Sequence, residues 1–394
     1  MPPQNTFPDV FIEELPGSPK PIEGVSTSST VFVGPTLTGP TDTTPALLTS
    51  LRDFESIYGD SSDFTFSDSP TPIHNFLFSA ARAFFENGGQ RLYIARVAAA
   101  AGQAGLAPTA TDYRTALITL EALGDISVVA APGSTVFAGS SLAQVAAVHA
   151  ELIAHVSRPA AYRFAVLDPP PGASTTDIQA IRSQVDSRYA ALYYPWVTIA
   201  DPNGGATPIA VPPSGFICGI YVNNDTNQGV FKAPANLPLV GALGFERSIA
   251  DAESTALNDL GINTLRFFPG RGNLVWGART TSSDPDWKYI NVRRFFIYIE
   301  SSIEKGIQWA VFGPNDSLLW AALASCISSF LVTEWRRGAL QGTKPEEAFF
   351  VKCDRTTMTQ SDIDSGRLVC LVGMAPVRPA EFVIVRICVK TAAG

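Results

Sequence analysis

From Thr30 onward, short apolar runs alternate with segments whose apolar residues recur at helical spacing. The apolar runs are TVFVG (30–34), QRLYIARV (90–97), ISVVAAPG (126–133), YRFAVLDPP (162–170) and YYPWVTIADP (193–202), and the helical segments are 49–59, 74–89, 112–123, 140–156 and 175–191. Continuously apolar strands separated by helices are typical of parallel strands joined by crossovers and covered on both faces. The sequence therefore predicts an α/β domain with a doubly wound parallel sheet over residues 25–227.

The pattern changes after residue 228. Residues 229–279 contain short apolar stretches separated by turn residues. They are followed by an amphipathic segment at 291–306, a strand-like run IQWAVF at 307–312 and a long helical pattern at 316–338. Asp316 at the start of that pattern and Arg336 with Gly338 at its end are typical helix-terminal residues. The sequence thus predicts a second, α+β domain over residues 228–379.

Both chain ends carry strand-like segments that lie outside these domains. The N-terminal segment (arm, 1–24) contains Val10, Phe11, Ile12, Glu13 and Glu14, and the C-terminal segment (arm, 380–394) contains Phe382, Val383, Ile384, Val385, Arg386, Ile387 and Val389. An isolated strand needs a partner for its backbone groups. Prolines within 16–23 favour an extended spacer that reaches about 25 Å. The N-terminal strand can therefore pair at the edge of its own domain or outside it.

Composition narrows the functional classes. Hydrophobic residues make up 46% and charged residues 16% of the 394-residue chain. This charged fraction is low for a soluble protein and suggests that part of the surface is covered by a partner. A formal charge of −8 without a Lys/Arg cluster argues against nucleic-acid binding. We expect no Sec-type signal peptide and no membrane span. The five cysteines lack CxxC spacing and indicate reduced thiols in a protein made in the cytoplasm.

No residue cluster predicts a catalytic, metal or cofactor site. His149 and His155 are six residues apart on one helix, whereas a metal pair prefers a spacing of four. The stretch GALQGTK (338–344) lacks the spacing and the Ser/Thr of a P-loop, and PGRGN (269–273) is typical of a tight turn. Asp284 and Asp286 flank Pro285, which favours an Asx turn over a catalytic pair.

An acidic, polar stretch at 354–368 contains Asp362 and Asp364. Two interpretations remain open for these carboxylates: a contact surface for a partner, or an exposed turn or short helix that faces solvent.

Several stretches resemble the contractile tail sheath family, and in particular the sheath proteins of phage-tail-like extracellular contractile injection systems. They are VFIEELPGSPKPIEGVSTSSTVFVG, RAFFENGGQRLYIARV, GIYVNNDTNQGVFKAPAN, FFPGRGNLVWGARTTSSDPDWKYINVRRFFIYIESSIEKGIQWAVFGPND and TKPEEAFFVKCDRTTMTQSDIDSGRLVCLVGMAPVRPAEFVIVRI. The resemblance extends over nearly the whole chain and is weakest between about 97 and 212.

This resemblance implies a structural subunit of stacked six-membered rings around an inner tube, contracting from a metastable extended state. The α/β domain would face outward and the α+β domain inward, and both terminal strands would complete a sheet in neighbouring subunits. The implied partners are further copies of the chain, the inner tube protein, baseplate and terminal cap proteins, and sheath paralogues. Asp362 and Asp364 are the expected tube-facing residues. The alternatives are a bacteriophage tail sheath and, from a different class, a cytosolic α/β enzyme.

Overall fold

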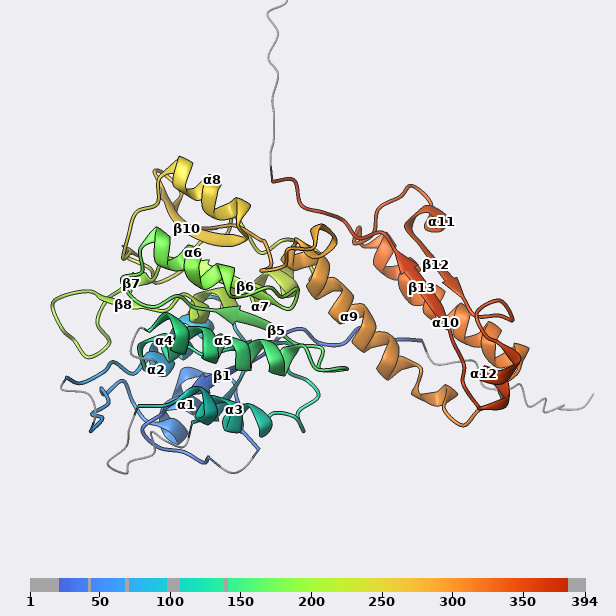
Figure 1. The fold of residues 1–394 in the computed structure, drawn as a ribbon, viewed down its shortest axis with the longest axis horizontal. Helices are drawn as coiled ribbons and strands as arrows, with labels where there is room; N and C mark the ends of the chain where they lie inside the picture. The colour runs from blue at the N-terminus through green and yellow to red at the C-terminus, as the bar shows by residue number, and fades with distance from the viewer. Residues whose placement is uncertain (1–20, 42–43, 68–70, 98–106, 138–140, 382–394) are drawn as a thin grey trace, which may run out of the picture. The chain divides into compact units, whose positions relative to one another are not determined.

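The computed structural model describes residues 21–41, 44–67, 71–97, 107–137 and 141–381 (Figure 1). These residues form two compact units. The α/β unit consists of 24–302 together with 376–381, and the C-terminal unit consists of 303–375 together with 21–23. The residues of both predicted terminal strands, 10–14 and 382–389, lie outside the described residues.

Strands and helices alternate along the α/β unit in the order expected of crossover connections. Its strands are β1 (Ser29–Gly34), β2 (Leu47–Leu48), β3 (Arg91–Arg96), β4 (Val128–Ala130), β5 (Phe164–Leu167), β6 (Ala190–Tyr194), β7 (Val197–Ile199), β8 (Ile209–Val211), β9 (Gly244–Phe245), β10 (Ile262–Phe268) and β11 (Gly272–Trp276). Its helices are α1 (Leu51–Tyr58), α2 (Phe76–Glu86), α3 (Ala110–Ile118), α4 (Ser134–Phe137), α5 (Leu142–Val156), α6 (Thr175–Ser183), α7 (Ser214–Asn227), α8 (Asp251–Asp259), the 3₁₀ turn η2 (Pro285–Trp287) and α9 (Ile290–Gly306), of which α9 continues into the C-terminal unit.

The main sheet has eight strands in the order β11-β10-β6-β5-β4-β1-β3-β2. The pairs β10–β6, β6–β5, β5–β4, β4–β1 and β1–β3 are parallel, and only β2 and β11 at the two edges run antiparallel. A second, three-stranded antiparallel sheet has the order β8-β7-β9. The prediction of a largely parallel α/β sheet is confirmed.

Alternate residues of each strand enter two separate hydrophobic cores, as the two-residue period of a strand requires. In β1, Phe32 belongs to the core formed with α1, α2, α7 and α9, whereas Val31 and Val33 belong to the core formed with α3, α5, α6 and α8. All three side chains are fully buried. The sheet is therefore covered by helices on both faces, which explains why its strands read as uninterrupted apolar runs.

A chain segment covers the outer edge of β11. Asn236 N–H donates to Val275 O (2.7 Å), Val275 N–H donates to Leu237 O (3.0 Å), and Leu239 N–H donates to Asn273 O (3.0 Å). The backbone groups of this edge are thus paired within the chain, which protects the edge from adding another strand.

The predicted domain boundary at 227/228 differs from the division seen in the structure, which falls between Ser302 and Ile303. The physical reason is that β10 continues the parallel sheet, with Ile262 opposite Leu192 of β6. The change in sequence pattern after residue 228 reflects the turn-rich segment that covers β11, and no new domain begins there.

The C-terminal unit is built on one long helix. It contains the 3₁₀ turn η3 (Gln308–Ala310), α10 (Ser317–Arg336), α11 (Pro345–Ala348), α12 (Gln360–Asp364) and an antiparallel pair of strands, β12 (Phe349–Lys352) and β13 (Leu371–Met374). Trp320, Cys353 and Met358 form its small core beside α10. Ile22 is also buried in this unit, and a Cβ added at Gly306 would meet its side chain at 2.7 Å.

One expectation for this region was wrong. The run 307–312 is not a strand, because successive turn hydrogen bonds, such as Ala310 N–H to Ile307 O at 2.9 Å, wind it into η3 and leave Phe312 fully exposed. Among the described residues, α10 has the length and mean hydropathy (1.5) of a membrane-spanning helix. Core helices of soluble proteins share these properties, and Trp320, Leu323 and Leu331 of α10 are buried.

Candidate subunit interface

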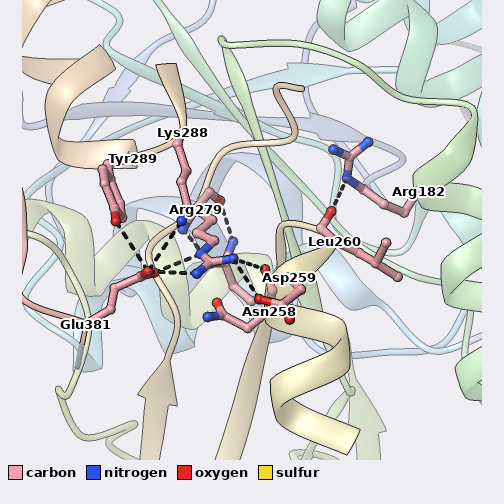
Figure 2. Close-up of polar contacts among 9 residues, drawn as sticks. Arg182, Asn258, Asp259, Leu260, Arg279, Lys288, Tyr289 and Glu381 are labelled. Carbon is pink, nitrogen blue, oxygen red and sulfur yellow. Dashed lines mark hydrogen bonds and ion pairs between the residues drawn. The ribbon is translucent and has the colours of Figure 1, made fainter. Parts of the chain in front are cut away.

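The last described residue, Glu381, is bound tightly to the α/β unit (Figure 2). Its carboxylate accepts two hydrogen bonds from Arg279, one from Nε (2.8 Å) and one from Nη2 (2.7 Å). Tyr289 Oη donates a third at 3.3 Å, and Lys288 Nζ lies 3.7 Å from the same carboxylate. A paired, two-pronged contact of this kind fixes both the position and the orientation of the carboxylate. We call this group of residues the Glu381 anchor.

The local fold places Arg279 where it can serve as the base of the anchor. Asn263 of β10 holds its backbone, because Asn263 Oδ1 accepts from Arg279 N–H at 2.7 Å. The Nη1 group donates to Asn258 O (2.6 Å), a carbonyl of the last turn of α8, and lies 3.5 Å from Asp259. The side chain of Arg279 is 5% exposed, whereas that of Asp259 is 69% exposed, so only the arginine end of that ion pair is sheltered from water. A cation at a helix C-terminus is also stabilised by the helix dipole.

The anchor is an ion pair under neutral conditions. Burial raises the pKa of Glu381, but the hydrogen bonds and positive charge of Arg279 outweigh it and hold that pKa below its ordinary value. For Arg279, burial acts to lower the pKa, and the contacts with Glu381 raise it above its ordinary value. Both groups are therefore held in their charged forms.

The segment before Glu381 is bound to the same unit. Asn291 Nδ2 of α9 donates to Val377 O at 3.2 Å, and Arg378 Nη2 lies 3.4 Å from Asp286 on the surface. After β13, the chain thus leaves the C-terminal unit at Ala375 and is attached to the α/β unit through residues 377–381. Residues 382–394 begin directly at this attachment.

The strand pair β12–β13 is open at its edges. Phe349 is opposite Met374 and Lys352 is opposite Leu371, and within the described part of the chain no third strand pairs with either one. Phe350 and Leu371 are 58% and 49% exposed. A two-stranded sheet is marginal alone and its free edges are templates for another strand. This pair can therefore accept strands from outside.

The predicted contact residues Asp362 and Asp364 lie in the short helix α12. Asp362 caps its own helix by accepting from Thr359 N–H (3.0 Å) and Thr359 Oγ1 (2.7 Å), and it pairs with Arg367 at 3.1 Å. Asp364 is exposed and accepts a bond from Gln360 Nε2 at 2.7 Å. Asp362 thus has a structural task, whereas Asp364 faces outward. Their contact with a tube stays a prediction.

The buried histidines and Asp168 of the α/β unit form hydrogen bonds with other groups of the same unit. His149 Nε2 lies 3.0 Å from Asp168 O, and His155 hydrogen-bonds to Arg163. Asp168 in turn accepts from Ser214 Oγ (2.5 Å) and Ser214 N–H (2.9 Å) at the start of α7. Asp284 caps η2 by accepting from Asp286 N–H at 2.9 Å, as expected for an Asx turn. Among the described residues, no group of three His, Cys, Asp or Glu side chains forms a metal site.

A doubly wound scaffold that anchors one chain end and leaves a strand pair open has the features of an assembly subunit. Comparison with known proteins agrees. Residues 107–281 match the phage tail sheath protein central domain, and residues 282–390 match the phage tail sheath C-terminal domain. The chain belongs to the phage tail sheath family.

Two solved structures resemble the chain over almost its full length. The helical sheath of the anti-feeding prophage in its contracted state has 30% sequence identity and a TM-score of 0.76, with 98% of this chain and 99% of that chain covered. The sheath complex of PVC, an extracellular contractile injection system, in its contracted state has 27% identity and a TM-score of 0.77, with 98% of both chains covered.

Phage proteins match over shorter regions. The tail sheath protein of Vibrio phage KVP40 is 27% identical over 177 residues, which are 44% of this chain and 26% of the phage protein. A putative prophage major tail sheath protein of Pseudomonas aeruginosa is 25% identical over 226 residues, 55% of each chain. The matches thus span between about a quarter and just over half of these relatives.

The Glu381 anchor was not found by sequence reasoning. Glu381 and Arg279 are 102 positions apart, and neither forms part of a recognisable motif. The one local signal was the charged residue directly before the apolar run 382–389, and it does not reveal which cation Glu381 binds.

Proposed function

We propose that the chain is the sheath subunit of a contractile injection particle. In this proposal it polymerises into stacked hexameric rings around an inner tube and contracts from a metastable extended state. Its similarity over 98% of its length to two sheaths in the contracted state, one of them from an extracellular contractile injection system, supports the assignment. The α/β unit would form the outer layer, and the C-terminal unit, with Asp364 exposed on it, would face the tube.

The terminal strands would pair in neighbouring copies. The observation that carries this proposal is the Glu381 anchor together with the open pair β12–β13. The chain is fastened to the α/β unit directly before the predicted strand 382–389 begins. Free edges on β12–β13 would receive strands from other copies.

Strand addition would keep neighbouring subunits linked while the lattice rearranges during contraction. Each main-chain hydrogen bond contributes about 1 kcal/mol net, so a single donated strand binds weakly. Every copy would give and receive strands, and multivalency would then hold the lattice together. The proline-containing spacer at 16–23 can change direction while the strands stay paired.

Contraction would be a switch between two packings of rigid subunits. A gain on the order of a few kcal/mol per subunit, summed over many copies, would drive it. The energy would be stored at assembly, with no bound nucleotide and no catalytic step. The remaining partners would be baseplate and cap proteins and sheath paralogues, and the particle would be assembled in the cytoplasm before release.

Two truncations test strand donation. Chains lacking residues 1–15 or 382–394 are expected to remain folded monomers by circular dichroism but to form no long striated tubes in negative-stain electron microscopy. Normal tubes from both truncations would refute strand donation. Discrete globular particles from the intact chain would favour the cytosolic enzyme alternative, and a head on particles from the native source would identify a bacteriophage tail.

A further inference from the structure

A groove of about 780 Å³ lies beside the Glu381 anchor, entirely within the α/β unit. Helix α8 forms one wall of the groove through Thr255 and Asn258, and Arg266 of the following strand, β10, extends this wall. Phe231 and Trp276 contribute apolar surface, and Trp276 is 37% exposed. Residues 377–381, the segment that leads to the C-terminal arm, complete the lining.

The groove contains polar atoms that lack a partner. Asn291 is 2% exposed, and its Oδ1 accepts no hydrogen bond although its Nδ2 donates to Phe231 O (2.8 Å) and Val377 O (3.2 Å). Asn258 Oδ1 is a second buried acceptor without a donor, and Arg266 Nε is a buried donor without an acceptor. These three atoms have almost no accessible surface, so a protein partner would contact the exposed part of the lining, which includes Thr255 and Trp276.

Chain connectivity limits what can lie against this groove. The predicted donated strand starts at Phe382, and the Cα atoms of consecutive residues are about 3.8 Å apart. No spacer therefore separates the Glu381 anchor from the strand, in contrast to the N-terminal arm with its spacer at 16–23. A copy that receives this strand must contact the surface around Glu381, and the groove is part of that surface.

We propose that the groove is the docking site for a second copy of this chain, namely the C-terminal unit of the neighbour that receives residues 382–389. This inference rests on the proposed strand donation. The main chain of the neighbour lies along the exposed side of α8 at Thr255, and an apolar side chain packs on Trp276 and Phe231. The donated strand and the groove then form one continuous interface, which would place each neighbour at a defined angle.

Photo-cross-linking tests the docking site. The chain with Thr255→p-benzoylphenylalanine carries the probe inside the groove, and Ala256→p-benzoylphenylalanine, on an exposed part of α8 outside the groove lining, is the matched control. Sheaths are assembled from equal amounts of ¹⁴N- and ¹⁵N-labelled chains, irradiated and analysed by mass spectrometry. We expect mixed-isotope cross-links from position 255 to residues 303–375, and few from position 256.

A third probe separates the inference from the function on which it rests. Arg386→p-benzoylphenylalanine reports strand donation directly. Mixed-isotope cross-links from 386 without any from 255 would overturn the groove assignment and leave strand donation intact. Cross-links from 386 that stay within one isotope would overturn both. Cross-links from 255 to residues 303–375 of the same copy would also refute the docking site.

A steric variant gives an independent measure. Thr255→Trp fills the groove from an exposed position, so the monomer is expected to fold normally. The concentration needed for sheath formation should rise about tenfold or more, as for the loss of one interface anchor. Ala256→Trp should leave it unchanged. Equal assembly by the two variants would contradict the proposal.

Discussion

Arg294 of α9 and Asp225 of α7 form a buried ion pair inside the α/β unit. Arg294 Nη1 and Nη2 lie 2.9 and 2.6 Å from the two oxygens of Asp225, and the two side chains are 4% and 3% exposed. The guanidinium also lies over the ring of Tyr221, 4.6 Å from its centroid. The pair joins the helix that leads toward the C-terminal unit to the core of the α/β unit.

Removal of Asp225 should be strongly destabilising. Asp225→Ala leaves an uncompensated buried charge on Arg294, which typically costs about 3–5 kcal/mol in unfolding free energy. Urea denaturation of the full chain at a monomeric concentration measures this. The control is Asp286→Ala, which removes the exposed pair with Arg378 and should cost about 1 kcal/mol or less. Similar losses in the two variants would show that burial of the Arg294 pair does not matter.

Disruption of the Glu381 anchor should affect assembly more than folding. Glu381→Gln removes the charge that Arg279 binds, and we expect a loss of about 1–3 kcal/mol in unfolding free energy together with a severe loss of sheath formation. Because the pKa of Glu381 is lowered, the stabilisation is complete above the unfolded pKa, near 4.5, and is lost as pH falls through the lower folded value. Denaturation and electron microscopy of Glu381→Gln beside Asp286→Asn would check this, and normal tubes from Glu381→Gln would argue against the anchor.

The α/β unit should lose stability in mild acid. Burial lowers the pKa of His149 and of His155 from 6.5 to about 4, so stability falls as pH drops from 6.5 toward 4, by about 1.4 kcal/mol per pH unit for each histidine. Burial raises the pKa of Asp168 from 3.8 to about 7, which gives the opposite slope in the same range. Asp168→Asn removes that opposing slope. Its unfolding free energy should therefore fall more steeply between pH 6.5 and 4 than that of the parent, and an unchanged slope would contradict this assignment.

Cys353 and Cys370 are expected to form a disulfide under oxidising conditions. They follow β12 and precede β13 at adjoining positions of the strand register, and their thiols are hydrogen-bonded to each other. Burial raises the pKa of Cys370 to about 12, so the reaction with diamide should be slow at neutral pH. A bond closing a loop of this size would add about 3 kcal/mol. Loss of two alkylation sites in the parent, but none in Cys353→Ser, would confirm the pair, and full labelling of both cysteines after diamide treatment would refute it.

The sheet could be predicted because the apolar runs of its strands and the capping residues of its helices can be recognised in short stretches of sequence. Strands such as 164–167 are buried on both faces, and each is flanked by a helix with its own terminal residues, for example the capping box of Ser174 and Asp177 at the start of α6. Pattern and propensity agree in these segments. The boundary at 228 failed because the placement of β10 beside β6 depends on contacts between residues about 70 positions apart.

The interface residues carry weaker sequence signals. The terminal strands were predicted from their apolar character, but nothing in the local sequence connects Glu381 with Arg279 or indicates a groove beside Asn291. The strand prediction at 307–312 failed for a related reason, since Val311 and Phe312 are apolar yet exposed in a turn. Exposed apolar residues of an assembly subunit resemble core residues in sequence, because both are to be covered by protein.

The segment at 236–239 forms hydrogen bonds with the backbone of β11, so this edge of the main sheet is already paired within the chain. At that border the main sheet offers no backbone groups to a passing strand, so two copies that meet there have no means to fuse their sheets into a continuous ribbon. Under the proposed strand addition, growth would be directed to the β12–β13 pair, which has two short edges to receive strands. The regular structure of such a polymer would therefore depend on the paired edge at β11 as well as on the open edges of β12–β13.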